Sequence, residues 1–173
     1  MTSTVPNVAH YLLAGKPPEQ KALTLLQTSF SYGDLAVQAG LIASYLLKLR
    51  AQPGDRILLI ADNSLFWVAC YLGTIQAGLV SVPVAPTMQA DDVAYLLEVT
   101  GATIICAQAS VLKTHAERLN GRHVVTDRDV PPLPHTASHR SLPSLAADTP
   151  PATEYAPVGE ADMSFTRYRV PSM

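Results

Sequence analysis

The spacing of apolar residues predicts that helices and strands alternate along most of the chain. After Ser31, which can cap a helix, apolar side chains recur every three or four positions as far as Arg50, and Asp34 completes a capping box. The next apolar run, Arg56–Ala61, is continuous rather than alternating, which is typical of a parallel strand covered on both faces. We therefore expect a long amphipathic helix followed by a strand in the interior of a sheet.

The alternation continues to residue 126. Further helices are predicted over 5–15, 65–77, 87–101 and 110–120, and further strands over 22–27, 79–84, 103–107 and 123–126. Strands that alternate with helices favour a mostly parallel sheet with right-handed crossovers and helices on both faces. The predicted fold class is α/β, with residues 1–126 as an N-terminal subdomain.

The remaining residues follow a different pattern. Seven of the 14 prolines fall in 127–160, where apolar residues show no period of 2 or 3.6, and we interpret this stretch as a Pro-rich linker or long surface loop. Residues 161–173 regain an extended pattern with Phe165, Tyr168 and Val170, which predicts a terminal strand. A lone strand needs a partner, so we expect it to pair with the sheet or with polypeptide beyond this chain.

Charge and composition narrow the classes of function. The chain has 12 Lys+Arg against 14 Asp+Glu and a net charge of −2, which argues against a nucleic-acid partner because phosphate binding needs a basic surface. Charged residues make up 15%, below the ~25% usual for a soluble domain. We therefore expect part of the surface to be covered by other polypeptide or to mediate self-association.

One stretch raises the question of a membrane span. Leu65–Pro86 is strongly apolar, but Gly78 and Pro83 interrupt it, and a proline inside a helix removes a hydrogen bond. We expect a buried helix, a glycine stop and a strand instead, without a membrane span. Cys70 and Cys106 lack metal-ligand spacing, and the start of the chain lacks a signal peptide, so we expect two buried thiols and a cytoplasmic location.

The motifs that could carry chemistry are incomplete or absent. Gly73–Gly78 has the glycine spacing of a phosphate loop, but Leu79-Val80 stands where Lys-Ser/Thr is needed, so we interpret it as a helix end. His135 and His139 lie four apart, yet they have prolines on both sides and no third ligand nearby. No Gly-x-Gly-x-x-Gly follows a predicted strand, and no Gly-x-Ser-x-Gly occurs.

The other titratable residues do not form a catalytic group either. Asp91 and Asp92 point about 100° apart on a helix, and their place in its first turn is explained by the helix dipole. His10, His115 and His123 are isolated in the sequence. We therefore assign no catalytic, cofactor-binding or metal-binding residue in this chain.

A family resemblance supplies the sharpest functional signal. Five segments occur in a fixed order: Ser29–Leu35, Pro53–Arg56, Ile57–Ile60, Asn63-Ser64 and Ala77–Pro86. Together they resemble the N-terminal part of the AMP-forming adenylating enzymes, which include acyl-CoA synthetases, fatty-acyl-AMP ligases and the adenylation domains of peptide synthetases. The matching positions look structural: turn glycines, a helix cap and buried strands.

The resemblance implies a two-step ligase. A carboxylic acid, expected to be a fatty or related acid, would react with ATP to give an acyl adenylate, and the acyl group would then pass to a thiol such as coenzyme A, with Mg²⁺ offsetting phosphate charge. The family's phosphate-binding loop follows a strand that looks like Asp162–Tyr168. Because that loop, the adenine and ribose contacts and the C-terminal domain are not in this sequence, we expect the chain alone to be an inactive fragment.

Two other hypotheses remain open. The chain could be a stand-alone α/β binding or scaffold module that docks a protein partner through its uncharged surface. It could also be an unrelated flavodoxin-like or Rossmann-like domain that binds a nucleotide at its strand ends. A co-purifying partner would favour the first, and binding of FMN or NAD would favour the second.

Overall fold

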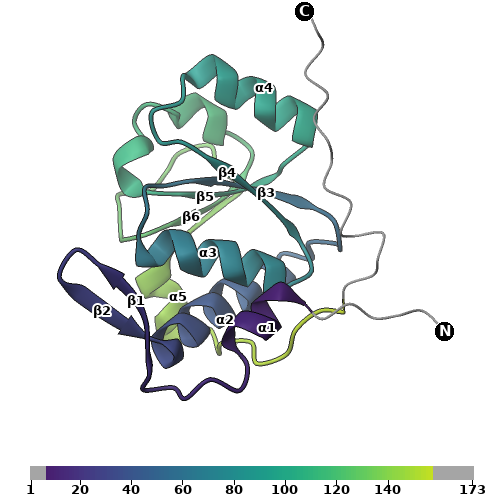
Figure 1. Ribbon diagram of the computed structural model, residues 1–173. Coiled ribbons are helices and arrows are strands. Elements are labelled where there is room, and N and C mark those ends of the chain that lie inside the picture. Colours follow the sequence, from purple (N-terminus) through teal and green to yellow (C-terminus); the bar gives the residue numbers. More distant parts are fainter. Residues whose placement is uncertain (1–6, 158–173) are drawn as a thin grey trace, which may run out of the picture.

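The computed structural model describes residues 7–157 and has an α/β fold (Figure 1). Five parallel strands lie in the order β4-β3-β5-β6-β7. Their bounds are Arg56–Ile60 for β3, Val80–Val84 for β4, Ile104–Ala107 for β5, His123–Thr126 for β6 and Ser138–Ser141 for β7. The predicted fold class is confirmed, and β3 occupies the interior position that its continuous apolar run predicts.

Helices cover both faces of this sheet (Figure 1). On one face lie α2 (Tyr32–Lys48), α3 (Leu65–Gln76) and α5 (Leu142–Asp148), with α1 (Val8–Leu13) packed against α3. On the other face lie α4 (Ala90–Thr100) and the short 3₁₀ turns η1 (Ala109–Val111) and η2 (Ala116–Leu119).

The alternation of side chains along β3 explains how both layers are held. Ile57 and Leu59 belong to the apolar cluster under α2 and α3, whereas Leu58 and Ile60 belong to the cluster under α4. All four side chains are at most 1% exposed. A strand whose successive residues are all buried is the pattern of a sheet that is covered on both sides.

Local signals fix the helix boundaries. The Ser31 hydroxyl accepts a hydrogen bond from the Asp34 backbone at 3.1 Å, and the Asp34 carboxylate accepts from the Ser31 backbone at 2.8 Å, so the predicted capping box of α2 is present. The hydrogen bond from the Ser31 backbone N–H to the Asp34 carboxylate, followed by one from the Ser31 hydroxyl at 2.9 Å, lowers the pKa of Asp34. Gly101 ends α4 in the left-handed conformation with φ of 63°, which a glycine adopts without steric cost.

The chain before α2 contains one more strand than the sequence predicts. Residues Lys21–Leu25 form β1, and Thr28–Ser31 form β2, which pairs with β1 as an antiparallel hairpin. We predicted a single strand over 22–27. The second strand is missed because its residues are mostly polar and partly exposed, so they carry no apolar period.

The predicted helix over 110–120 is wrong. The chain forms η1 and η2 there instead, with three-residue hydrogen bonds such as Thr114 N–H to Val111 O at 3.1 Å and Arg118 N–H to His115 O at 2.8 Å. Ser, Thr and Asn bond readily to nearby backbone groups, and this segment carries one of each. Such residues favour short turns over a continuous helix.

The interpretation of 127–160 as a linker or long surface loop is wrong for residues 138–148. Strand β7 completes the sheet beside β6, and α5 follows it directly. The strand is Ser-His-Arg-Ser at the sheet edge, so it has no apolar alternation to detect. The helix has only seven residues, of which Leu142 and Leu145 are buried. The division of the chain into separate domains stays a prediction, and the predicted strand over 161–173 lies outside the described residues.

Residues 149–157, which we call the strap, lie against α2 and the end of α3. The Ala152 N–H donates to Gly40 O at 2.9 Å, and the Gln76 side chain donates to Ala152 O and Glu154 O at 2.9 and 3.0 Å. A Cβ on Gly40 would lie 2.6 Å from Ala152 O. Only glycine therefore lets the strap approach α2 this closely.

Candidate functional site

The carboxyl edge of the parallel sheet is the candidate location for a binding site. In open α/β sheets, ligands bind in the crevice beyond the carboxyl ends of parallel strands. Asp62 follows β3, Ala85 follows β4, Gln108 follows β5 and Asp127 follows β6. Three of these four residues are polar, so polar side chains from β3, β5 and β6 gather at one edge.

A small open cavity lies at this edge, between the ends of β3 and β4. Its volume is about 260 Å³. It is lined by Ala61, Asp62, Asn63, Trp67, Pro83, Val84, Ala85 and Pro86. Because Asp62 is the one charged residue of the lining, the cavity has no cationic side chain to bind phosphate.

Gln108 and Asp127 hold the loops around this edge. The Gln108 side-chain oxygen accepts from Asp62 N–H at 2.8 Å, and the Gln108 N–H donates to Ile60 O at 2.9 Å. The Asp127 carboxylate accepts from Ala109 N–H at 2.6 Å. Each of these side chains uses one oxygen atom to position the backbone of a neighbouring loop.

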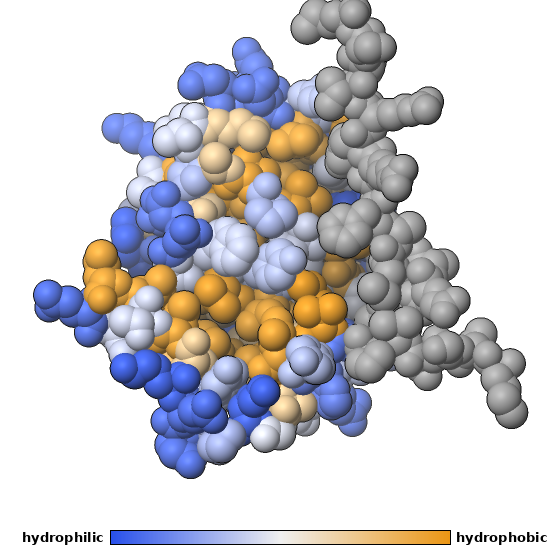
Figure 2. All heavy atoms as spheres, viewed as in Figure 1, coloured by the Kyte–Doolittle hydropathy of each residue, from blue (hydrophilic) through white to orange (hydrophobic). Residues whose placement is uncertain are grey.

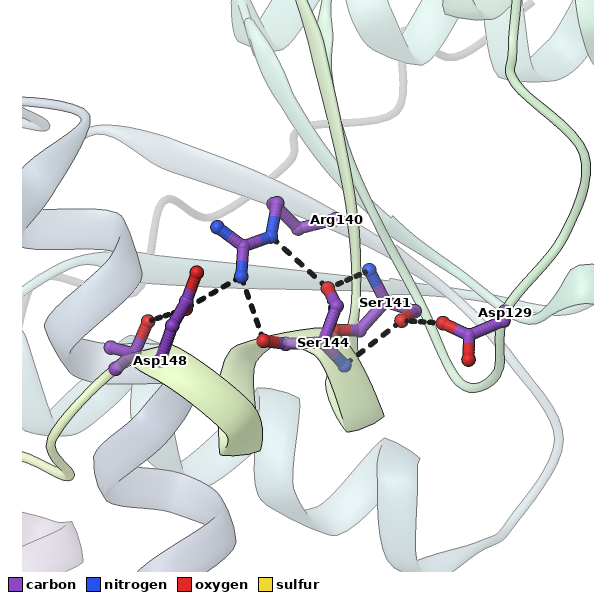
Figure 3. A network of polar contacts seen from close by, with 6 residues as sticks. Asp129, Arg140, Ser141, Ser144 and Asp148 are labelled. Atoms are coloured by element: carbon purple, nitrogen blue, oxygen red, sulfur yellow. Dashed lines mark hydrogen bonds and ion pairs between the residues drawn. The ribbon is translucent and has the colours of Figure 1, made fainter.

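A polar network joins β7 to α5 (Figure 3). Arg140 donates to the Ser144 hydroxyl and carbonyl at 3.0 and 2.7 Å and to the Asp148 carboxylate at 2.6 Å. Ser141 caps the helix by accepting from Ser144 N–H, and its hydroxyl donates to Asp129. The hydrogen bond from Arg140 is the main cause that lowers the pKa of Asp148, and a hydrogen bond from Thr149 lowers it further. The network anchors a short helix to an edge strand.

Two imidazoles lie on the last strands of the sheet. The Thr126 hydroxyl donates to Arg128 O at 2.9 Å and so accepts from His139 Nε2 at 3.0 Å, which places a proton on that nitrogen. Burial lowers the pKa of His139, and the nearby Asp129 opposes this shift. His123 Nδ1 lies 2.8 Å from the Ser138 hydroxyl oxygen. The same oxygen lies 2.9 Å from the Tyr45 hydroxyl.

The other histidines lie apart from one another. His10 packs edge-on against Tyr155 with ring centroids 4.9 Å apart, and His115 is buried between η1 and η2. His135 lies in the turn before β7, whereas His139 lies within it. Within residues 7–157 no group of three or more His, Cys, Asp or Glu side chains could hold a metal ion.

The remaining candidates have structural positions. Gly73 lies inside α3 and Gly78 follows its end with φ of 77°, so this segment is the helix terminus that we predicted. Asp91 pairs with Arg118 at 3.1 Å in the first turn of α4. Cys70 and Cys106 are free and buried. Burial is the main cause that raises the pKa of Cys70, and the neighbouring Cys106 thiol raises it further.

Sequence reasoning missed the cavity and the residues that hold it. Gln108 directly follows β5, and Asp62 follows β3 after Ala61, so a polar residue at the end of an apolar strand was the available signal. The pairing of β3 with β4 brings Asp62 near Pro86, and no local pattern encodes that pairing. None of the helices described in 7–157 has the length and apolar content needed to cross a bilayer.

Comparison with known proteins identifies the family. The model of the family described as AMP-binding enzyme matches residues 13–165. The chain therefore belongs to the AMP-binding enzyme family, and the resemblance found in the sequence is confirmed.

Three relatives show the extent of the match. HC-toxin synthetase of Cochliobolus carbonum is 28% identical over 153 residues, which are 88% of this chain and 3% of that protein. The mitochondrial medium-chain acyl-CoA ligase ACSF2 of Pongo abelii is 36% identical over 90 residues, 51% of this chain and 15% of that protein. A crystal structure of a benzoate CoA ligase from Burkholderia xenovorans LB400 has a TM-score of 0.72 at 26% identity, over 88% of this chain and 30% of that one. The chain thus spans less than a third of the length of each.

Proposed function

We propose that this chain is the N-terminal portion of an AMP-forming ligase that activates a carboxylic acid, and that it is inactive by itself. The observation that carries the proposal is the family match over 13–165, combined with the 30% of the benzoate CoA ligase that the chain covers. The polar groups at the carboxyl edge support the second half of the proposal, because Gln108, Asp127 and Asp129 bond to the protein itself.

The proposed reaction has two steps. A carboxylate oxygen of the acid attacks the α-phosphorus of ATP, the bond to the bridging β-phosphate oxygen breaks, and acyl-AMP and pyrophosphate form. A thiol such as that of coenzyme A then attacks the acyl carbonyl, loses its proton and displaces AMP. Mg²⁺ would offset phosphate charge, but the described residues do not fit a site for it, so we place no step on this chain's own side chains.

The acid is proposed to be a fatty or related acid. The support is the similarity to a medium-chain acyl-CoA ligase, which is 36% identical over 90 residues. We also propose a cytoplasmic location, which the two free buried cysteines support because a reducing compartment keeps thiols unpaired.

The main partner is proposed to be the remainder of the same enzyme. Large apolar side chains are exposed on α1 at Val8, Tyr11 and Leu12, and on α4 at Tyr95 and Val99. Figure 2 shows apolar side chains gathered over the face on which α3 lies. Exposed apolar surface of this kind favours contact with further polypeptide, and self-association of the isolated chain is the alternative.

An exchange assay tests the proposal. We expect the polypeptide encoded when translation continues past Met173 to incorporate labelled pyrophosphate into ATP in the presence of a fatty acid, and the 173-residue chain to give no such exchange. Codons after Met173 that encode a Ser/Thr/Gly-rich loop ending in Lys-Gly would support this expectation in advance. Acid-dependent exchange by the 173-residue chain, or none by the continued polypeptide with any aliphatic or aromatic acid, would refute the proposal.

A further inference from the structure

The cavity between β3 and β4 is held in shape from several sides. Gln108 fixes the backbone at Asp62 through its 2.8 Å hydrogen bond, and the Ser64 hydroxyl accepts from Trp67 N–H at 3.1 Å at the start of α3. Pro83 and Pro86 form the wall contributed by β4 and the residues after it, and each proline restricts its own φ. Most of the lining is therefore ordered before a ligand arrives, which reduces the entropy cost of binding.

The aromatic side of the cavity is also fixed. Trp67 stacks on Tyr71 with ring centroids 5.1 Å apart and an angle of 6° between the ring planes. Both residues are half-buried on α3, where they pack against the apolar cluster of the sheet. Trp67 also lines the cavity, and an indole ring can bind planar or cationic groups.

The charge of the lining favours a cation. Asp62 contributes a full negative charge, and no lining residue is basic. The N-terminus of α3 contributes an opposing positive charge of about one half. One of the backbone N–H groups that carry this charge, that of Trp67, already donates to the Ser64 hydroxyl. The negative charge of the Asp62 carboxylate is thus larger than the positive charge of the helix end. The cavity therefore disfavours phosphate and carboxylate ligands.

We propose that this cavity binds a planar cationic group of a small molecule, an amidinium or guanidinium, with its plane against Trp67 and its N–H groups toward the Asp62 carboxylate. The volume of about 260 Å³ lies just below the roughly 300 Å³ of small ligand pockets and suits a group the size of one substituted ring. This site does not depend on the proposed ligase reaction, because it uses neither ATP nor an acid.

Three isosteric probes test the charge preference. Benzamidine is planar and cationic, benzamide is its neutral counterpart and benzoate its anionic counterpart. Trp67 is the single tryptophan of the sequence, so indole fluorescence of the full chain reports on the cavity. We expect benzamidine to give a saturable change and to bind about fivefold more tightly than either of the other two. Amide resonances of Asp62, Asn63 and Ala85 should shift with the same midpoint.

Matched variants locate the effect. Asp62→Asn removes the proposed charge at an exposed position and should weaken benzamidine binding about fivefold. Asp92→Asn, exposed on α4 and outside the cavity lining, should leave it unchanged. The proposal is overturned if benzamidine gives no saturable change, if the three probes bind equally, or if Asp62→Asn binds benzamidine as the wild type does.

Discussion

At the scale of single residues, His115 is a buried polar side chain without a hydrogen-bond partner among residues 7–157. The side chain is 1% exposed, and neither ring nitrogen has a hydrogen-bond partner among residues 7–157. Burial lowers the pKa of His115, and the positive charge of Arg118 lowers it further. The imidazole is therefore neutral at pH 7, and its buried polar atoms carry a desolvation cost.

His115→Leu is expected to raise the free energy of unfolding at pH 7 by about 1 kcal/mol, because it removes buried polar atoms that lack partners. The unfolded state binds more protons than the folded state below the ordinary pKa of 6.5, so stability falls as the pH drops through that value. The His115→Leu variant should therefore lose less stability than the wild type when the pH drops below 6.5. Urea unfolding at several values of pH measures both effects.

His135→Asn is the surface control for this prediction, since His135 is exposed in a turn and asparagine tolerates its positive φ. It should not change the stability at pH 7 by a comparable amount. If His115→Leu loses stability at pH 7, a polar partner of the imidazole must exist, and our description of this residue is wrong.

At the scale of elements, the contact between α2 and α3 depends on a glycine. A Cβ on Gly73 would lie 2.5 Å from Ala39 O and 2.8 Å from Ile42 Cβ, both on α2. Backbone atoms of a packed helix cannot move aside cheaply. The two helices are therefore held at a separation that only a residue without a side chain permits.

Gly73→Ala should lower the free energy of unfolding by about 2 kcal/mol, because overpacking outweighs the roughly 1 kcal/mol that alanine gains in helix propensity. Val37→Ala, at an exposed position of α2, serves as the control and should change stability little. Thermal and urea unfolding of both variants provide the measurement. A Gly73→Ala protein as stable as the wild type would show that the helices can separate.

The elements also show how far the sequence predicts this fold. Helix α2 is predictable because a capping box and a long apolar period agree, and β3 because every residue after Arg56 is apolar. Strand β7 is not predictable in this way, because an edge strand of Ser-His-Arg-Ser buries little apolar surface. The cavity was missed for another reason: it exists only once β3 and β4 pair, which is a long-range event.

At the scale of the whole molecule, one side chain ties three distant segments together. Asn7 accepts from Ala9 N–H at 3.0 Å and donates to Ile75 O and Ala156 O at 2.7 and 3.1 Å. It therefore connects α1, the end of α3 and the strap. The residue is 5% exposed, so loss of these hydrogen bonds would leave buried backbone groups without partners.

Asn7→Ala should lower the free energy of unfolding by about 2 kcal/mol, since it removes a helix cap and two buried hydrogen bonds. Asn7→Asp keeps the cap acceptor but turns a carboxylate toward two carbonyl oxygens, so it should be no more stable than Asn7→Ala. The exposed Asn120→Ala is the control. Urea unfolding compares the three, and an Asn7→Ala chain with wild-type stability would contradict the role of Asn7.

Under the proposed function, this chain supplies a scaffold and the rest of the enzyme completes the active site. The sheet and its two helical layers match those of a benzoate CoA ligase, of which the chain covers 30%. The polar side chains described at the carboxyl edge mostly hold loops and helices in place. We therefore place nucleotide chemistry in polypeptide outside this chain, as the proposed function requires.

Calorimetric titration of the 173-residue chain with ATP and Mg²⁺ tests this central claim most directly. If the chain supplies structure and the rest of the enzyme supplies the nucleotide site, the titration should show no saturable heat, while the continued polypeptide binds ATP. One-to-one binding of ATP by the 173-residue chain, with micromolar affinity, would contradict the account.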